Sequence, residues 1–148
     1  MSYRGANWVH QPSDFRTVGS LANGIKPDLV ILYLTIPRET VEQILEPAPS
    51  RTSVSNVIIL LGPKGIYYAT AEGPSGHEEA YNVEMVDSTR GGDAFLGCYA
   101  ADYVRQKAQG EWNIQQAVQR AHRALACTIS RIGAQTSIPW ADEIDALE

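Results

Sequence analysis

The segment Val86–Phe95 places a carboxylate beside two consecutive glycines at the predicted junction of a strand and a helix. Gly91 and Gly92 allow a tight turn that points backbone N–H groups outward, and the following helix adds positive potential at its first turn. Such a ring of donors stabilises the negative charge that develops on a transferring phosphoryl group. Asp93 is placed to accept a proton from an attacking hydroxyl. These residues are therefore candidates for phosphoryl-transfer chemistry.

The same residues also have a purely structural interpretation. Asp93 could serve only as the N-cap of the helix, and Gly91–Gly92 only as a strand-to-helix turn. On spacing alone this structural interpretation is the stronger of the two. The motif therefore does not settle the function by itself.

Strand patterns precede this turn and helical patterns follow it. Apolar runs and turn residues predict strands at 29–34, 57–61, 66–70 and about 79–85, with a short helix opening at 36. The first and second form buried strands, and the third returns from the second as a hairpin through the turn 62–65. Later periodicity predicts one helix ending at Gly110, a second from Asn113 to Gly133 with Arg120 and Arg123 on its solvent face, and a short acidic helix 142–147. The order favours an α/β fold in which helices cover a sheet.

The composition limits the classes of function. The chain has 148 residues, a net charge of −5 and only 2 cysteines. Scattered Lys and Arg argue against duplex nucleic acid, because phosphate affinity needs clustered cations. We expect Cys98 and Cys127 to be reduced core residues. The apolar run 29–34 is too short to span a bilayer, and 1–15 lacks an apolar signal core, so we expect a cytoplasmic location with the nucleus as the alternative.

Several segments together are similar to one family of enzymes. Asp87–Phe95 resembles the second signature of the ribokinase-like (PfkB) carbohydrate kinases, D-T-T-G-A-G-D-A-F. Gly133–Trp140 and Glu143–Ala146 resemble the C-terminal part of that family, and Val57–Gly65 resembles its strand and turn beside the nucleotide. The matching segments occur in the family's order over nearly the whole chain. The resemblance implies a partial ribokinase-like fold, with a mostly parallel sheet carrying a β-hairpin and flanked by helices.

The resemblance also implies roles for individual residues in ATP-dependent phosphorylation of a small, ribose-like sugar. Asp93 would be the catalytic base, and the amides of Arg90, Gly91 and Gly92 would form an anion hole. The nucleotide would be contacted by Leu60, Leu61, Gly62, Pro63, Lys64, Gly65, Gly92 and His122. A potassium ion would be held, largely by main-chain oxygens, at Asp87, Thr89, Thr128, Arg131, Gly133 and Ser137, and Mg²⁺ would arrive with ATP.

Some of these residues have simpler interpretations as well. His122 could be an ordinary packed histidine of its helix, and Arg131 could only cap the helix C-terminus. Ser137 could only make a loop turn, and Lys64 could point into water. Trp140 is expected to anchor the tail with its indole N–H in water.

The sequence also departs from the family pattern. Nothing in 1–24 resembles the Gly-rich sugar-binding signature, Thr35 stands where a sugar-contacting glutamate is expected, and Arg90 replaces a small residue. The stretch between Pro49 and Val57 is too short to hold the family's Asn-x-x-Glu motif. We therefore expect residues 1–148 to form a single truncated kinase domain without the N-terminal sugar-binding portion and lid, with weak or no activity. The alternatives are a non-catalytic nucleotide-binding remnant and an interaction partner of an intact kinase. Unpaired sheet edges favour self-association, so we expect a homodimer or poor solubility.

Overall fold

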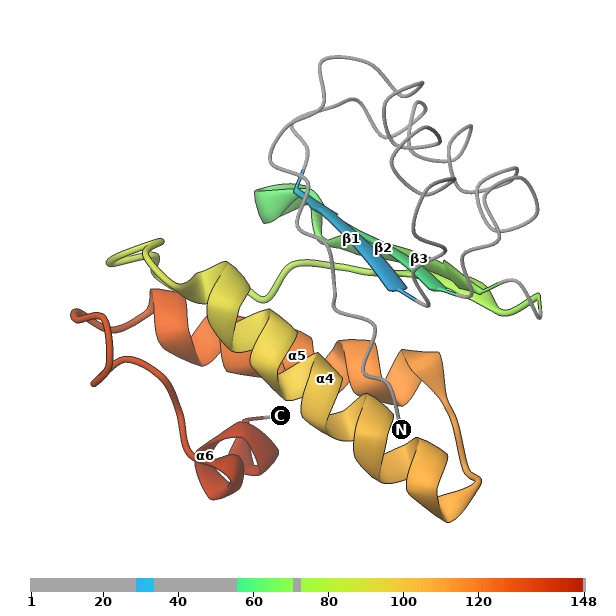
Figure 1. Ribbon diagram of the computed structural model, residues 1–148. Helices are drawn as coiled ribbons and strands as arrows, with labels where there is room; N and C mark the ends of the chain where they lie inside the picture. Colours follow the sequence, from blue (N-terminus) through green and yellow to red (C-terminus); the bar gives the residue numbers. More distant parts are fainter. Residues whose placement is uncertain (1–28, 34–55, 71–72, 148) are drawn as a thin grey trace. The chain divides into compact units, whose positions relative to one another are not determined.

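The computed structural model describes residues 29–33, 56–70 and 73–147 (Figure 1). They fall into two compact units, one within residues 1–80 and the other within 81–148. Each unit is described by itself below. The short helix predicted after residue 36 and the shortened stretch before Val57 lie outside the described residues, as does Thr35.

The first unit contains a four-stranded sheet with the order β1-β2-β3-β4 (Figure 1). Strand β1 (Leu29–Tyr33) runs parallel to β2 (Asn56–Leu60), whereas β2 is antiparallel to β3 (Ile66–Thr70) and β3 to β4 (Ser75–Glu78). Every residue of β2 and β3 is buried, and the apolar run 57–61 predicts this burial for β2. The hairpin is confirmed. A mostly parallel sheet is not confirmed, because two of the three ladders among the described strands are antiparallel.

Strand β4 begins earlier than the sequence predicts. The expected strand at about 79–85 has no regular structure, and β4 covers Ser75–Glu78 instead. The amide of Thr70, the last residue of β3, donates to the carbonyl of Pro74 just before β4 over 2.8 Å. Gly76 lies opposite Tyr68 in the ladder. A Cβ atom at Gly76 would overlap the Tyr68 hydroxyl, so glycine makes room for that ring.

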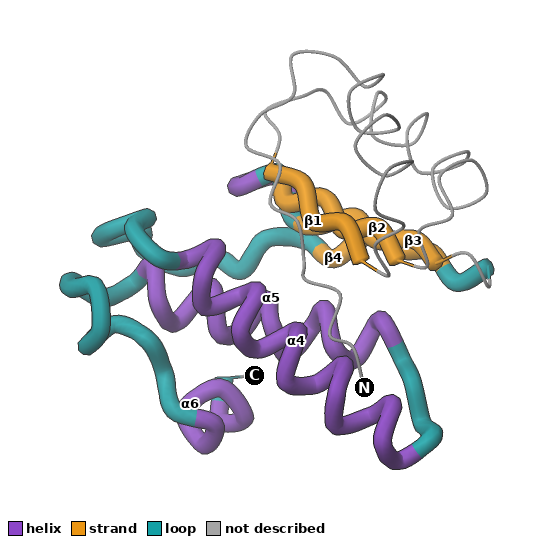
Figure 2. Tube along the Cα trace, viewed as in Figure 1, coloured by secondary structure: helices purple, strands orange, loops and turns teal. Residues whose placement is uncertain are grey.

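The second unit is a pair of helices with a short third one. Helices α4 (Gly91–Gln109) and α5 (Ile114–Ile129) lie side by side, and α6 (Ala141–Ala146) packs on α5 (Figures 1 and 2). The predicted ends at Gly110 and Asn113 are confirmed: Gly110 is left-handed with φ 76°, and the Asn113 side chain accepts the Gln116 amide over 3.1 Å. Helix α5 ends at Ile129 rather than Gly133.

The contact between α4 and α5 has an apolar part and a polar part. Phe95 and Tyr99 of α4 and Val118 of α5 are fully buried. Further along α4 the buried residues are Asp102 and Gln106, whereas Val104 is exposed. The buried carboxylate of Asp102 needs a cation, because an isolated charge in an apolar environment is very unfavourable.

Arg120 supplies that cation, so its predicted place on the solvent face is wrong. Its side chain is only 16% exposed, and Nη1 lies 3.3 Å from Oδ1 of Asp102. Arg105 reaches the same carboxylate over 2.8 Å. Arg120 also forms a two-pronged pair with Asp145 of α6, at 2.7 and 3.1 Å. Arg120 therefore connects all three helices.

The cysteines are unpaired, as predicted, with Cys127 buried and Cys98 half-buried. Burial raises the pKa of both thiols. Among the described residues there is no helix with the length and apolar character needed to cross a bilayer. The described part of the chain also lacks any cluster of three or more His, Cys, Asp or Glu side chains arranged to hold a metal.

Candidate active site

The turn before α4 is built around Arg90. Arg90 has φ 67° and ψ 0°, the left-handed conformation, and is the only described residue other than glycine with a positive φ. Its carbonyl accepts the Ala94 amide over 2.9 Å, which starts the helix. Gly91 and Gly92 are the first helical residues and do not need left-handed backbone. The predicted turn exists, but Arg90 rather than the two glycines makes it.

Gly91 is small for a different reason. A Cβ atom on Gly91 would lie 2.8 Å from Cγ2 of Ile129, closer than side chains tolerate. The backbone at the start of α4 therefore lies directly against the end of α5. The amide of Gly91 donates to the Ser88 carbonyl at 3.3 Å, a long bond near the limit for a hydrogen bond.

Asp93 presents its carboxylate to solvent. The side chain is 62% exposed, lies in the first turn of α4, and has Nε of Arg90 at 4.0 Å as an ion-pair partner. Arg90 occupies the N-cap position and Asp93 does not, so the N-cap interpretation of Asp93 is wrong. An accessible carboxylate at the positive end of a helix can meet a polar substrate.

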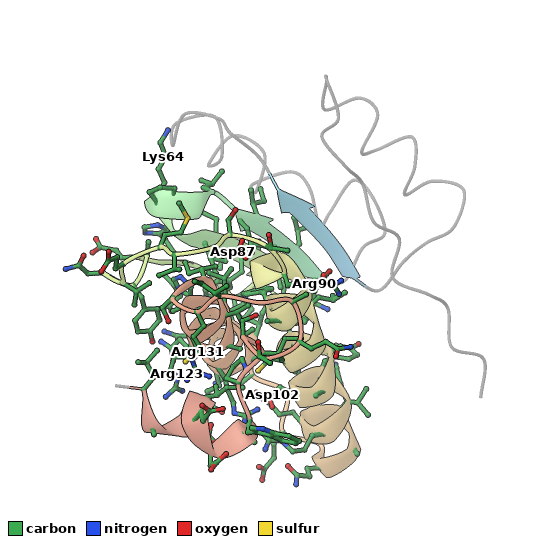
Figure 3. The ribbon with its side chains drawn as sticks, turned by 90° about the vertical axis from the view of Figure 1, so that its left-hand side faces the viewer. Lys64, Asp87, Arg90, Asp102, Arg123 and Arg131 are labelled. Atoms are coloured by element: carbon green, nitrogen blue, oxygen red, sulfur yellow. The ribbon has the colours of Figure 1, made fainter. Side chains whose placement is uncertain are left out.

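Asp87 is fixed in the segment that leads into this turn. Its Oδ1 accepts the amide of Thr89 over 2.9 Å, and hydrogen bonds from the side chain of Thr89 first and from its amide second lower the pKa of Asp87. The carbonyl of Ile129 accepts two amides, from Val86 at 2.8 Å and from Asp87 at 3.1 Å. The segment before α4 is thereby fastened to the C-terminus of α5 (Figure 3). Two groups of predicted cation-site residues, at 87–89 and 128–131, are brought together in this way.

The loop after α5 carries the remaining predicted cation ligands. Thr128 is buried, and its hydroxyl donates to the Ala124 carbonyl at 2.8 Å. Gly133 is left-handed with φ 112°. Ser137 is 1% exposed, and its hydroxyl has no hydrogen-bond partner within the described part of the chain. A buried hydroxyl normally has a hydrogen-bond or ion partner, so this oxygen suits a ligand of the loop.

Arg131 and Trp140 do not behave as the simpler interpretations predict. The guanidinium of Arg131 pairs with Glu143 of α6 at 2.8 Å (Figure 3). The Trp140 ring is 79% exposed and does not anchor the tail. Two other features hold the tail. Ile144 is only 6% exposed, and the Arg123 guanidinium donates to the Leu147 carbonyl at 3.3 Å.

His122 of α5 is buried, with 4% of its surface exposed. Its ring meets Tyr81 edge to face with centroids 4.9 Å apart. The packed-histidine interpretation describes this position well. Contact of His122 with a nucleotide stays a prediction.

The predicted nucleotide turn lies between β2 and β3 of the first unit. The turn η1 (Gly62–Lys64) is closed by a bond from the Leu61 amide to the Gly65 carbonyl at 2.9 Å. Gly65 has φ 84°, and a Cβ there would overlap the Glu78 carbonyl, so glycine is required. Lys64 is exposed, as predicted (Figure 3).

His77 of β4 contacts this turn, and the sequence analysis does not predict that contact. Its Nε2 lies 2.9 Å from the Lys64 carbonyl, and its ring stacks on Tyr67 with centroids 4.1 Å apart. The register of the β3–β4 ladder places His77 opposite Tyr67. No sequence motif marks it.

Comparisons with known proteins point to one family. The family model described as pfkB family carbohydrate kinase matches residues 6–141. A ribokinase from Staphylococcus aureus is 35% identical over 92 residues, which cover 62% of this chain and 29% of that protein. A ribokinase structure from Arabidopsis thaliana, complexed with ribose and ATP, aligns with a TM-score of 0.67 at 20% identity, covering 85% of this chain and 41% of that one. A putative ribokinase II from E. coli, in complex with ATP and Mg²⁺, aligns with a TM-score of 0.63 at 24% identity, covering 88% and 41%. The chain thus spans less than half the length of these relatives.

Proposed function

The chain belongs to the pfkB family of carbohydrate kinases and has a ribokinase-like fold, and from that premise we propose that it serves ATP-dependent phosphorylation of a sugar hydroxyl, as a ribokinase-type enzyme. The observation that carries this proposal is the exposed carboxylate of Asp93 in the first turn of α4. Asp93 follows directly on the turn at Arg90, and the segment that leads into this turn is hydrogen-bonded to the end of α5. Phosphoryl transfer depends mainly on positioning and electrostatics, and this arrangement supplies both.

In the proposed reaction Asp93 accepts the proton of a sugar hydroxyl as its oxygen attacks the γ-phosphorus of ATP. The new O–P bond forms while the bond to the β–γ bridging oxygen breaks, and ADP leaves. The amides of Arg90, Gly91 and Gly92, with the positive end of α4, stabilise the charge on the equatorial oxygens. The Arg90 guanidinium, 48% exposed, adds a cation at the same point.

We propose a monovalent cation, potassium, beside this turn. Asp87, Thr89, Thr128, Arg131, Gly133 and Ser137 would hold it, mostly through main-chain oxygens. Two observations fit: the buried Ser137 hydroxyl without a partner among the described residues, and the fastening of the Asp87 segment to the end of α5. Such an ion supplies a fixed positive charge close to the anion turn.

The remaining ligands are proposed from those bound by the relatives. The turn from Leu60 to Gly65 and His122 are proposed to contact ATP, which brings Mg²⁺ with it, and a small ribose-like sugar is the proposed acceptor. The E. coli protein is in complex with ATP and Mg²⁺ and the Arabidopsis protein with ribose and ATP, and these ligands support the proposed ones. A cytoplasmic location suits such substrates.

We further propose that this chain by itself phosphorylates sugar slowly or not at all. It carries the proposed base and the anion turn, but residues 1–24 do not resemble the family's Gly-rich sugar signature. Much of a rate enhancement, roughly 7–11 kcal/mol, comes from holding the acceptor aligned. The alternative is a non-catalytic nucleotide-binding remnant or a partner of an intact kinase. A homodimer is the proposed assembly.

The experiment is ATP binding by calorimetry, followed by a coupled phosphorylation assay with ribose, K⁺ and Mg²⁺. Binding with turnover supports the enzyme, and Asp93→Asn should then lower turnover roughly 10²–10⁴-fold. The matched control is Asp142→Asn, which removes another exposed carboxylate from the first turn of a helix. Binding without turnover supports the remnant. Absence of binding at millimolar ATP supports the interaction partner and refutes the nucleotide site.

A further inference from the structure

We propose that Glu143 is a positioning residue that closes the loop 131–140 and thereby pre-forms the cation site. The inference rests on the cation site of the proposed function and goes beyond it, because it assigns a role to a residue outside the ligand set. Glu143 lies in the first turn of α6, after the loop has ended.

A single carboxylate holds both ends of this loop. Oε1 of Glu143 pairs with Nη2 of Arg131 at 2.8 Å, and Oε2 accepts the amide of Trp140 over 2.7 Å. Both contacts are short, and hydrogen bonds to an ionised group are about twice as strong as neutral ones. Arg131 begins the loop and Trp140 ends it, so Glu143 ties its beginning to its end.

The tie matters because of what the loop contains. Ser137 faces inward, with 1% exposure and a hydroxyl that finds no partner in the described residues. Nearby, Thr136 Oγ1 donates to the Ile132 carbonyl at 3.3 Å. Pinning the two ends of a loop removes most of its alternative conformations before any ligand arrives. A cation that binds to a pre-formed loop does not have to order it, so its affinity is higher.

Glu143 can act in this way because α6 is itself fixed. Asp145, one turn beyond Trp140, forms the two-pronged pair with Arg120, whose side chain is only 16% exposed. Arg123 reaches the Leu147 carbonyl at 3.3 Å, and Ile144 is 6% exposed. An isolated surface ion pair contributes little to stability, partly because two mobile side chains must be ordered. This entropy cost is smaller for Glu143, because the helix that carries it is already fixed.

The test compares Glu143→Ala with Asp142→Ala in the full chain. Both remove a carboxylate from the first turn of α6, but Asp142 is exposed and takes part in no ion pair with a described residue. Calorimetric titration of ATP in the presence of Mg²⁺ is repeated over a series of KCl concentrations, with choline chloride holding the ionic strength constant. We expect the K⁺ concentration for half-maximal effect to rise roughly fivefold or more in Glu143→Ala. ATP affinity at saturating K⁺ should stay within about twofold of wild type, and Asp142→Ala should match wild type.

Hydrogen exchange provides the readout that does not need a ligand. Amides of 132–138 should exchange faster in Glu143→Ala, while those of α5 stay protected. If α5 also loses protection, Glu143→Gln replaces the alanine variant, because it keeps the side-chain length while removing the charge, and a smaller shift of K⁺ dependence is expected.

The outcomes separate this inference from the function on which it rests. A K⁺ dependence that is the same in Glu143→Ala, Asp142→Ala and wild type overturns the positioning role and leaves the cation site standing. ATP binding without any K⁺ dependence in wild type overturns both the cation site and the role of Glu143, while the nucleotide site stands. A selective shift in Glu143→Ala supports the proposal.

Discussion

Replacement of Arg90 tests the turn on which the proposed site depends. Arg90 is left-handed, and this conformation costs a residue with a Cβ atom about 1–2 kcal/mol relative to glycine. Arg90→Gly removes that cost but gives the unfolded chain more freedom, worth about 0.5–1 kcal/mol in the opposite direction. The Arg90–Asp93 pair, at 4.0 Å with both side chains about half exposed or more, contributes little. We expect a net gain of about 0.5–1 kcal/mol in the free energy of unfolding.

Arg90→Ala is the matched variant, because it removes the same charge and keeps the Cβ atom in the left-handed conformation. It should give no gain. Urea unfolding followed by circular dichroism measures both, and with a slope of about 2 kcal/mol per molar urea the glycine midpoint should lie about 0.3–0.5 M above wild type. Equal midpoints for the glycine and alanine variants would refute the assignment of strain to Arg90.

Two further predictions concern the packing that supports the site. Gly91→Ala should lower the free energy of unfolding by about 1–3 kcal/mol, since its Cβ would meet Ile129 at 2.8 Å, whereas Gly97→Ala, with nothing within 4 Å, should raise it by up to about 1 kcal/mol. Urea midpoints of the two variants that move in the same direction would contradict this. Asp102→Ala should cost about 2–4 kcal/mol, because it leaves Arg120, only 16% exposed, without one of its two carboxylates. A loss below about 1 kcal/mol in the same measurement would show that the pair is not a structural requirement.

The sequence predicts those parts of the fold that local signals determine. The β2–β3 hairpin follows from two apolar runs around a Gly-Pro-Lys-Gly turn, and the ends of α4 and α5 follow from Gly110 and Asn113. Strand β4 could not be placed, because its position depends on the fit of Gly76 against Tyr68 across the ladder. Arg120 was assigned to solvent because helical periodicity does not reveal that Asp102 faces inward.

The sequence and the structure give different reasons for the residues of the candidate site. The sequence predicts a turn before Asp93, yet the left-handed residue in it is Arg90, and Gly91 is small because Ile129 lies against it. That contact joins residues far apart in the sequence, so no local pattern shows it. Glu143 was missed for the same reason, although a glutamate in the first turn of a helix is a known signal for a bond back to the preceding backbone.

Amide NMR during a titration with ATP and Mg²⁺ in potassium buffer tests most directly whether the turn before α4 receives the terminal phosphate of ATP. We predict saturable shifts of the Gly91, Gly92 and Asp93 amide resonances, with smaller changes when choline replaces potassium. ATP binding that leaves these three resonances unmoved, or no binding at millimolar ATP, would contradict it.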